Sequence, residues 1–120
     1  MRIVIETIPH SKQRYPTVGD YWRDPDGTLQ IRISDLGSLR AETLIAIHEL
    51  IEQILTEAAG ISNEIIDKFD IGHPELDDPG ASEHAPYHHQ HTLATSVEMM
   101  MCAWLGWSWE GYNRLVDAAQ

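Results

Sequence analysis

The sequence has one cysteine, only eight lysine and arginine residues, and no long apolar run in its 120 residues. A single cysteine, Cys102, excludes an intrachain disulfide framework and a four-cysteine zinc site. The scarce cations form no cluster, which argues against binding to a nucleic-acid backbone. No segment reaches the ~20 apolar residues of a membrane span, and the start, MRIVIETIP, lacks the features of a signal peptide. We therefore expect a cytoplasmic protein without a nucleic-acid or membrane partner.

Negative charge is what the sequence has in excess. Nineteen aspartate and glutamate residues give a net charge of −11, while 42% of the residues are hydrophobic. This hydrophobic content is typical of a globular chain rather than a disordered one, and the length predicts a single domain over residues 1–120. The acidity indicates a well-solvated surface and is compatible with a basic partner.

The first third of the chain predicts strands. Residues 2–8 are short and β-branched, and residues 19–33 have the alternation of a hairpin. The turn of that hairpin is expected at Asp24–Gly27, where glycine can adopt positive φ.

The rest of the chain predicts helices. Ser38 as N-cap and Gly60 as C-terminal stop bound a long helix near 39–59. Other helices are expected over 62–71, from about 86–90 to 105, and after Ser108. Strands followed by helices indicate an α+β fold. We expect a short antiparallel sheet, made of the N-terminal strand and the hairpin, packed on two long helices and a short C-terminal helix.

Both long helices place polar residues on an apolar face. His48 and Glu52 lie one turn apart on the first helix, and His91 and Glu98 lie seven residues apart on the second, so each pair shares a face. A buried carboxylate costs several kcal/mol unless it is protonated, paired or metal-bound. Imidazole and carboxylate ligands together suit a divalent transition metal, and zinc in particular.

A metal-free interpretation stays open for the same four residues. Hydrogen bonds from His48 to Glu98 and from His91 to Glu52 would satisfy the buried polar groups as a network. Asp67 and Asp70, in IIDKFD, are further candidates for a metal ligand or for a hydrogen bond to an imidazole. The other candidates are more simply explained as exposed histidines and a small buried thiol: His84, His88, His89 and Cys102.

The segment AIHELIEQIL, which follows a strand of alternating apolar residues, resembles the active helix of zincin metallopeptidases. In that family the HExxH motif supplies two zinc ligands and a general base. The resemblance implies a zincin-like fold, His48 as the first ligand, Glu49 as the base and a peptide or protein substrate. Glu52 stands where the second histidine is expected, and His91, with Glu98 behind it, supplies the third ligand.

The whole chain also resembles a family of small uncharacterised proteins encoded by bacteriophages and prophages. The shared pieces include TIPHSKQRYPTVGDYW, DGTLQIRISDLG, HELIEQIL, DKFD, APY followed by His91, and LGWSWEGY. This resemblance implies a phage origin, location in the host cytoplasm, and HExxE as the family's own pattern.

Two other functions fit parts of the sequence. One is an acidic phage accessory protein that is not an enzyme and binds a host or virion protein; the net charge and the C-terminal tryptophans favour it. The other is a magnesium-dependent nucleotide pyrophosphatase, because the acids of two ExxE/D motifs resemble those of the all-α enzymes of that class. Those acids are Glu49, Glu52, Glu64 and Asp67.

Overall fold

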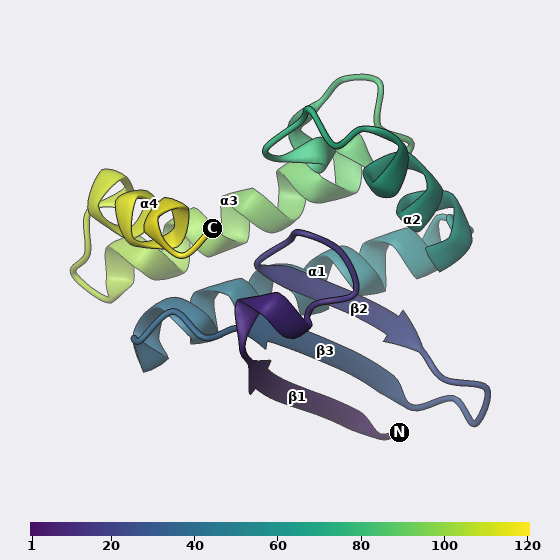
Figure 1. Cartoon of the computed structure of the whole chain (residues 1–120), viewed down its shortest axis with the longest axis horizontal. Helices are drawn as coiled ribbons and strands as arrows, with labels where there is room; N and C mark the ends of the chain where they lie inside the picture. Colours follow the sequence, from purple (N-terminus) through teal and green to yellow (C-terminus); the bar gives the residue numbers. More distant parts are fainter.

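A computed structural model describes all residues from 1 to 120 and has an α+β architecture, as expected (Figure 1). Its sheet has three strands, β1 (Ile3–Ile8), β2 (Gly19–Arg23) and β3 (Leu29–Ser34), in the order β1-β3-β2. β2 and β3 pair antiparallel as the predicted hairpin, with Gly27 at φ +89° in its turn.

The prediction of an antiparallel sheet is wrong for β1, which pairs parallel with β3. After β1, the chain passes through a short 3-10 helix, η1 (His10–Lys12), and reaches the far edge of the sheet before it forms β2. The hairpin then returns β3 to the central position. β2 runs opposite to β1, and β3 runs opposite to β2. β3 therefore points in the same direction as β1, and the sheet is mixed.

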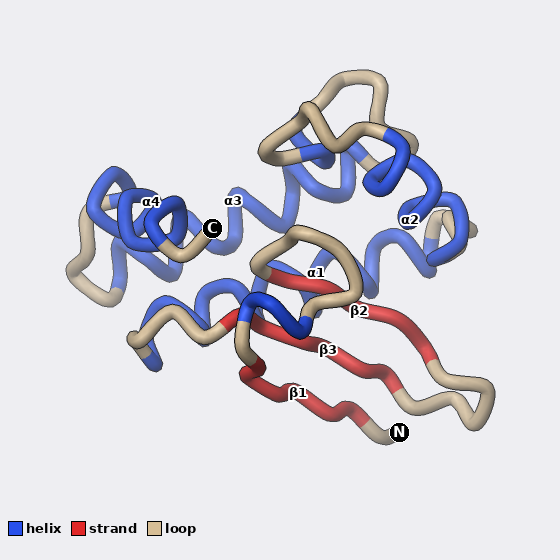
Figure 2. The backbone as a smooth tube through the Cα atoms, in the orientation of Figure 1, coloured by secondary structure: helices blue, strands red, loops and turns tan.

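The long helix α1 (Leu39–Ala58) covers one face of the sheet (Figure 2). Its N-cap is Ser38, whose hydroxyl accepts a hydrogen bond from the Ala41 amide, as the sequence predicts. The side chains that β3 directs at α1, from Leu29, Ile31 and Ile33, are almost completely buried. Packing of these apolar residues fixes the position of α1 relative to the hairpin.

Three further helices complete the domain: α2 (Asn63–Gly72), α3 (His88–Trp104) and α4 (Trp109–Ala118). They match the ranges predicted from the sequence. The 73–87 connection includes the short 3-10 helix η2 (Pro79–Ala81), which packs against α3. α3 lies beside α1, and α4 packs across the C-terminal part of α3 (Figure 1). No helix combines the length and the apolarity that crossing a membrane requires.

The C-terminal aromatic cluster is mainly part of the core. Tyr112 is fully buried, and Trp107 and Trp109 pack their rings against it at centroid distances of 5.3 and 5.4 Å. Trp104 is the exception, with 81% of its surface exposed. These rings pack on one another within α4 and the turn before it, and the Tyr112 hydroxyl joins α4 to Glu98 of α3.

Candidate metal centre

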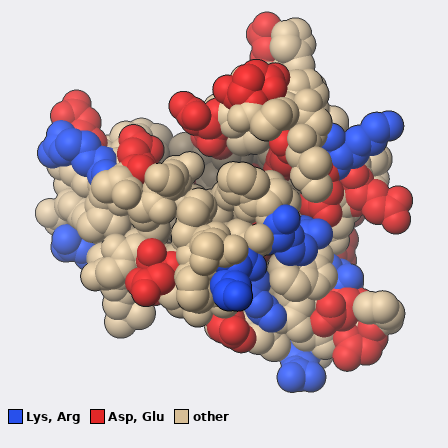
Figure 3. All heavy atoms as spheres, viewed as in Figure 1, with Lys and Arg blue, Asp and Glu red and all other residues tan.

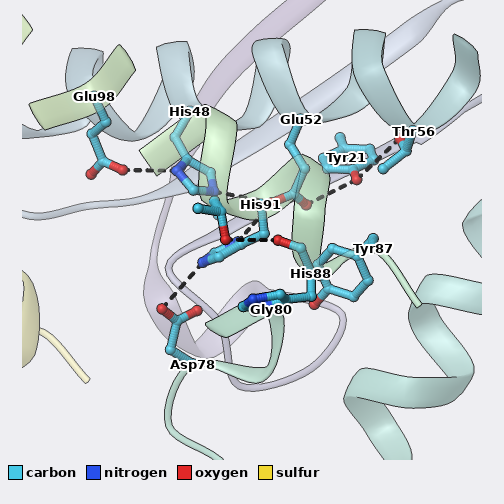
Figure 4. A network of polar contacts seen from close by, with 12 residues as sticks. Tyr21, His48, Glu52, Thr56, Asp78, Gly80, Tyr87, His88, His91 and Glu98 are labelled. Atoms are coloured by element: carbon cyan, nitrogen blue, oxygen red, sulfur yellow. Dashed lines mark hydrogen bonds and ion pairs between the residues drawn. The ribbon is translucent and has the colours of Figure 1, made fainter. Parts of the chain in front are cut away.

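The contact between α1 and α3 brings together the four polar residues singled out in the sequence. His48, Glu52 and Glu98 are buried, and the side chain of His91 is 12% exposed. α1 presents His48 and Glu52 one turn apart, and α3 presents His91 and Glu98 two turns apart (Figure 4). The apolar faces of the two helices thus meet around a polar centre.

Three of these side chains converge on one point. His48 Nε2 lies 3.1 Å from Glu52 Oε2, and His91 Nδ1 lies 2.8 Å from the same oxygen. One ligand atom from each of the three residues falls within 4.8 Å of the others, so the group can hold a metal ion. Zinc with ligands at about 2.0–2.1 Å would separate neighbouring ligand atoms by roughly 3.3 Å. The two imidazole-to-carboxylate distances, 3.1 and 2.8 Å, are slightly shorter than that separation.

The second nitrogen of each imidazole has its own carboxylate partner. His48 Nδ1 lies 2.8 Å from Glu98 Oε1, and the Tyr112 hydroxyl donates to the other oxygen of Glu98. His91 Nε2 lies 3.3 Å from Asp78 Oδ2 (Figure 4). Such carboxylate–imidazole pairs orient metal-binding histidines and fix their tautomers. Glu98 therefore orients His48 and is not one of the three converging residues.

Glu52 is held from the side opposite the imidazoles. The Tyr21 hydroxyl donates to Glu52 Oε1 at 2.9 Å, which leaves Oε2 facing His48 and His91. Tyr21 comes from β2, on the face of the sheet that α1 covers. The hairpin thus fixes the orientation of the one carboxylate at the centre of the cluster.

The two hydrogen bonds of the metal-free interpretation are also present, His48–Glu98 and His91–Glu52. Burial opposes charge on His48, but hydrogen bonds to Glu52 and Glu98 outweigh it and raise its pKa to about 11. Burial likewise opposes charge on His91, and the Asp78 and Glu52 hydrogen bonds raise its pKa to about 9. For Glu52, burial favours the neutral acid, but the two imidazoles lower its pKa to about 2. Without a metal, the cluster therefore consists of the protonated rings of His48 and His91, each hydrogen-bonded to carboxylates.

Glu49 differs from the other acids at the centre because its carboxylate has no hydrogen-bond partner. It lines the same cavity as His48, Glu52 and His91. Burial, together with the charge of Glu52, raises the pKa of Glu49 well above its usual range. Gly19 on β2 makes room for it, because a Cβ there would come within 2.8 Å of Glu49 Cδ. A free carboxylate beside the cluster is available to take or give a proton.

The cavity at the cluster has a volume of about 60 Å³ and joins a larger cleft of about 340 Å³. Both are lined by His48, Glu49 and His91, so the cleft opens directly at the cluster. A small molecule or a segment of a larger one can therefore approach the converging atoms from the cleft.

The remaining sequence candidates lie around the cluster and not in it. Asp70 lines the cavity and accepts hydrogen bonds from the Tyr15 and Tyr87 hydroxyls. Asp67 forms an ion pair with Arg14 at 3.0 Å. Neither aspartate hydrogen-bonds to an imidazole. The three other candidate histidines and the cysteine lie apart from the cluster: His84 and His89 are exposed, His88 contacts the Gly80 carbonyl oxygen, and Cys102 donates to the Trp107 carbonyl oxygen.

Sequence reasoning missed three residues that shape the centre: Tyr21, Asp78 and Tyr112. Tyr21 lies on the buried face of β2, a strand that the sequence predicts. A tyrosine hydroxyl buried there needs a hydrogen-bond partner, and this was the signal available in the sequence. Asp78 lies in the connection before α3, where no periodic pattern predicts its position. Tyr112 lies in the helix expected after Ser108, but its bond to Glu98 depends on how α4 packs.

Comparison with protein-family models, with curated proteins and with solved structures finds no match. The interpretation of the centre therefore rests on its own geometry and chemistry.

Gly80 offers a test that leaves every candidate ligand unchanged. A Cβ at Gly80 would overlap the His91 ring and come within 2.9 Å of the Tyr87 ring. We expect Gly80→Ala to displace His91 and weaken zinc affinity about 10- to 100-fold, as changes around metal ligands commonly do. Competition titration with a coloured zinc chelator measures the affinity. Gly72→Ala is the matched control, because a Cβ there meets no atom within 4 Å. Equal affinities for both variants would contradict the role given to His91.

Zinc binding should release protons. With pKa values of about 11 and 9, His48 and His91 are both protonated at pH 7 in the metal-free protein. A metal ligand must be the neutral imidazole, so each ion bound should displace about two protons. Titration calorimetry in two buffers of different ionisation enthalpy counts them. Zinc binding without proton release would show that the rings are neutral beforehand.

Proposed function

We propose that the protein is a zinc-dependent hydrolase of the zincin type that acts on peptide or protein amide bonds. The observation that supports it most is the convergence of His48 Nε2, Glu52 Oε2 and His91 Nδ1 beside the unpaired carboxylate of Glu49. Two histidines and one glutamate form one of the three-ligand sets of catalytic zinc sites, which keep a fourth position open.

The exchange of histidine for glutamate in HExxE fits this proposal. Glu52 takes the second ligand position on α1, and α3 supplies a histidine, His91, as the third ligand. The set therefore keeps two imidazoles and one carboxylate although their order along the chain changes. The imidazole ligands favour zinc or another transition metal over magnesium, which prefers an all-oxygen shell.

Residues of the chain would each carry out one part of the reaction. A bound zinc ion would supply Lewis-acid polarisation of water and of the substrate carbonyl. Glu49 would accept a proton from the attacking water at its free carboxylate and pass it to the leaving amine. Glu98 and Asp78 would keep His48 and His91 oriented, and Tyr21 would hold Glu52.

The alternatives receive less support from the residues. For the magnesium pyrophosphatase, Glu64 is exposed and does not line the cavity with Glu49 and Glu52. Asp67 does line that cavity, but it forms an ion pair with Arg14. For the accessory protein, Trp107 and Trp109 pack in the core, and of the C-terminal tryptophans only Trp104 offers a largely exposed ring. The phage setting implied by the sequence resemblance stays a prediction.

Glu49→Gln tests the catalytic half of the proposal. The amide keeps the shape of the side chain but cannot act as a base, so kcat/KM should fall about 10²- to 10⁴-fold while zinc content is unchanged. The measurement uses a mixed library of internally quenched fluorescent peptides, with zinc determined on the same samples.

Glu64→Gln is the control for that test, since Glu64 is an exposed acid that lines neither cavity. It should keep wild-type activity. Equal activity of Glu49→Gln and wild type would contradict the proposed base. A zinc-loaded wild type that cleaves no peptide would contradict amide hydrolysis and leave metal binding in place.

A further inference from the structure

Acidic residues outnumber the cationic groups around the cleft beside the metal centre, where His48 and His91 are the imidazolium rings described above. The wall of the cleft includes six carboxylate residues and no lysine or arginine: Glu49, Asp70, Asp77, Asp78, Glu98 and Asp117. The 73–79 loop and α4 both contribute to this wall, and these two elements lie apart from each other in Figure 1. Figure 3 shows acidic side chains on the rim of the hollow that opens on this face of the molecule.

Three of these acidic side chains have no partner within the chain, and two of the three are exposed to a ligand. Glu98 and Asp70 are engaged by tyrosine hydroxyls, and Asp78 faces His91. Glu49, Asp77 and Asp117 accept no side-chain hydrogen bond or ion pair within the chain. Asp77 and Asp117 are exposed, one on the loop side and one on the α4 side.

Apolar residues line the cleft between these acids. Val18, Ile45 and Val116 contribute buried or half-buried aliphatic surface, and Leu76 and Trp109 add to it from the two sides. Lysine and arginine side chains have an apolar stem and a charged end, and they pack the stem on such surface while the charge meets carboxylates. A volume of about 340 Å³ is larger than one side chain needs and leaves room for adjoining backbone.

We infer that the cleft binds a peptide segment that carries a lysine or arginine side chain close to the bond presented to the metal centre. This inference rests on the proposed function and adds to it a substrate class, basic peptides. Carboxylates that line a concave site focus the potential, attract cationic ligands and repel acidic ones. Asp77 and Asp117 act as specificity-determining residues, since they are the free acids at the two sides.

Binding of short peptides to the purified full-length chain tests the inference. The probes are two capped pentapeptides, alanine throughout except for a central lysine in one and a central glutamate in the other, and the linear polyamine spermidine. Titration calorimetry at low and high salt gives the affinities. Zinc content and peptide integrity are determined on each sample, so loss of metal binding and loss of peptide preference are seen separately.

We expect the lysine peptide to bind about tenfold more tightly than the glutamate peptide at low salt, with a smaller ratio at high salt. The double variant Asp77→Asn/Asp117→Asn should weaken lysine-peptide binding about fivefold. The matched control Glu75→Gln/Glu110→Gln removes the same charge from the same loop and helix, at exposed acids outside the cleft, and should change it less than about twofold.

Three results would overturn the inference. Equal affinities for the lysine and glutamate peptides would show that the cleft has no charge preference. An equal loss in the control variant would show an effect of net charge and not of the cleft. Spermidine binding as tight as that of the lysine peptide would identify a free amine, and not a peptide, as the ligand. None of these results bears on whether the centre holds zinc, which the metal content reports independently.

Discussion

Compensation of negative charge at the contact between α1 and α3 is the constraint on which the centre depends. Glu52 and Glu98 are both buried there, where an uncompensated carboxylate costs several kcal/mol. In the metal-free chain two imidazolium rings supply the compensating charge. A divalent cation held by neutral imidazoles supplies the same charge, so the cluster can exchange two protons for one metal ion with its net charge unchanged.

Packing between neighbouring elements of the fold positions the residues of this cluster. Apolar residues of β3 and α1 fix the first helix on the sheet, and Tyr21 of the hairpin then reaches Glu52. Aromatic packing of α4 places the Tyr112 hydroxyl on Glu98. Each polar residue of the centre is thus positioned by a neighbouring element, while Glu49 alone has no partner and faces the cleft.

The features that could be predicted from sequence are those with a local pattern. Helical periodicity placed His48 with Glu52 and His91 with Glu98, and capping residues such as Ser38 set the helix bounds. The direction of β1 relative to β3 could not be predicted, because it depends on which strand takes the central position. Asp78 was missed because its contact with His91 also depends on packing between distant parts of the chain, here on how the loop before α3 closes.

The central claim is that His48, Glu52 and His91 hold a transition metal ion, and metal content tests it most directly. Elemental mass spectrometry on tag-free protein should find close to one zinc per chain. His48→Ala and His91→Ala should each lose it while circular dichroism shows the fold retained. Wild-type protein that carries no metal and ignores added zinc would contradict the account and leave the four residues as a buried hydrogen-bond network.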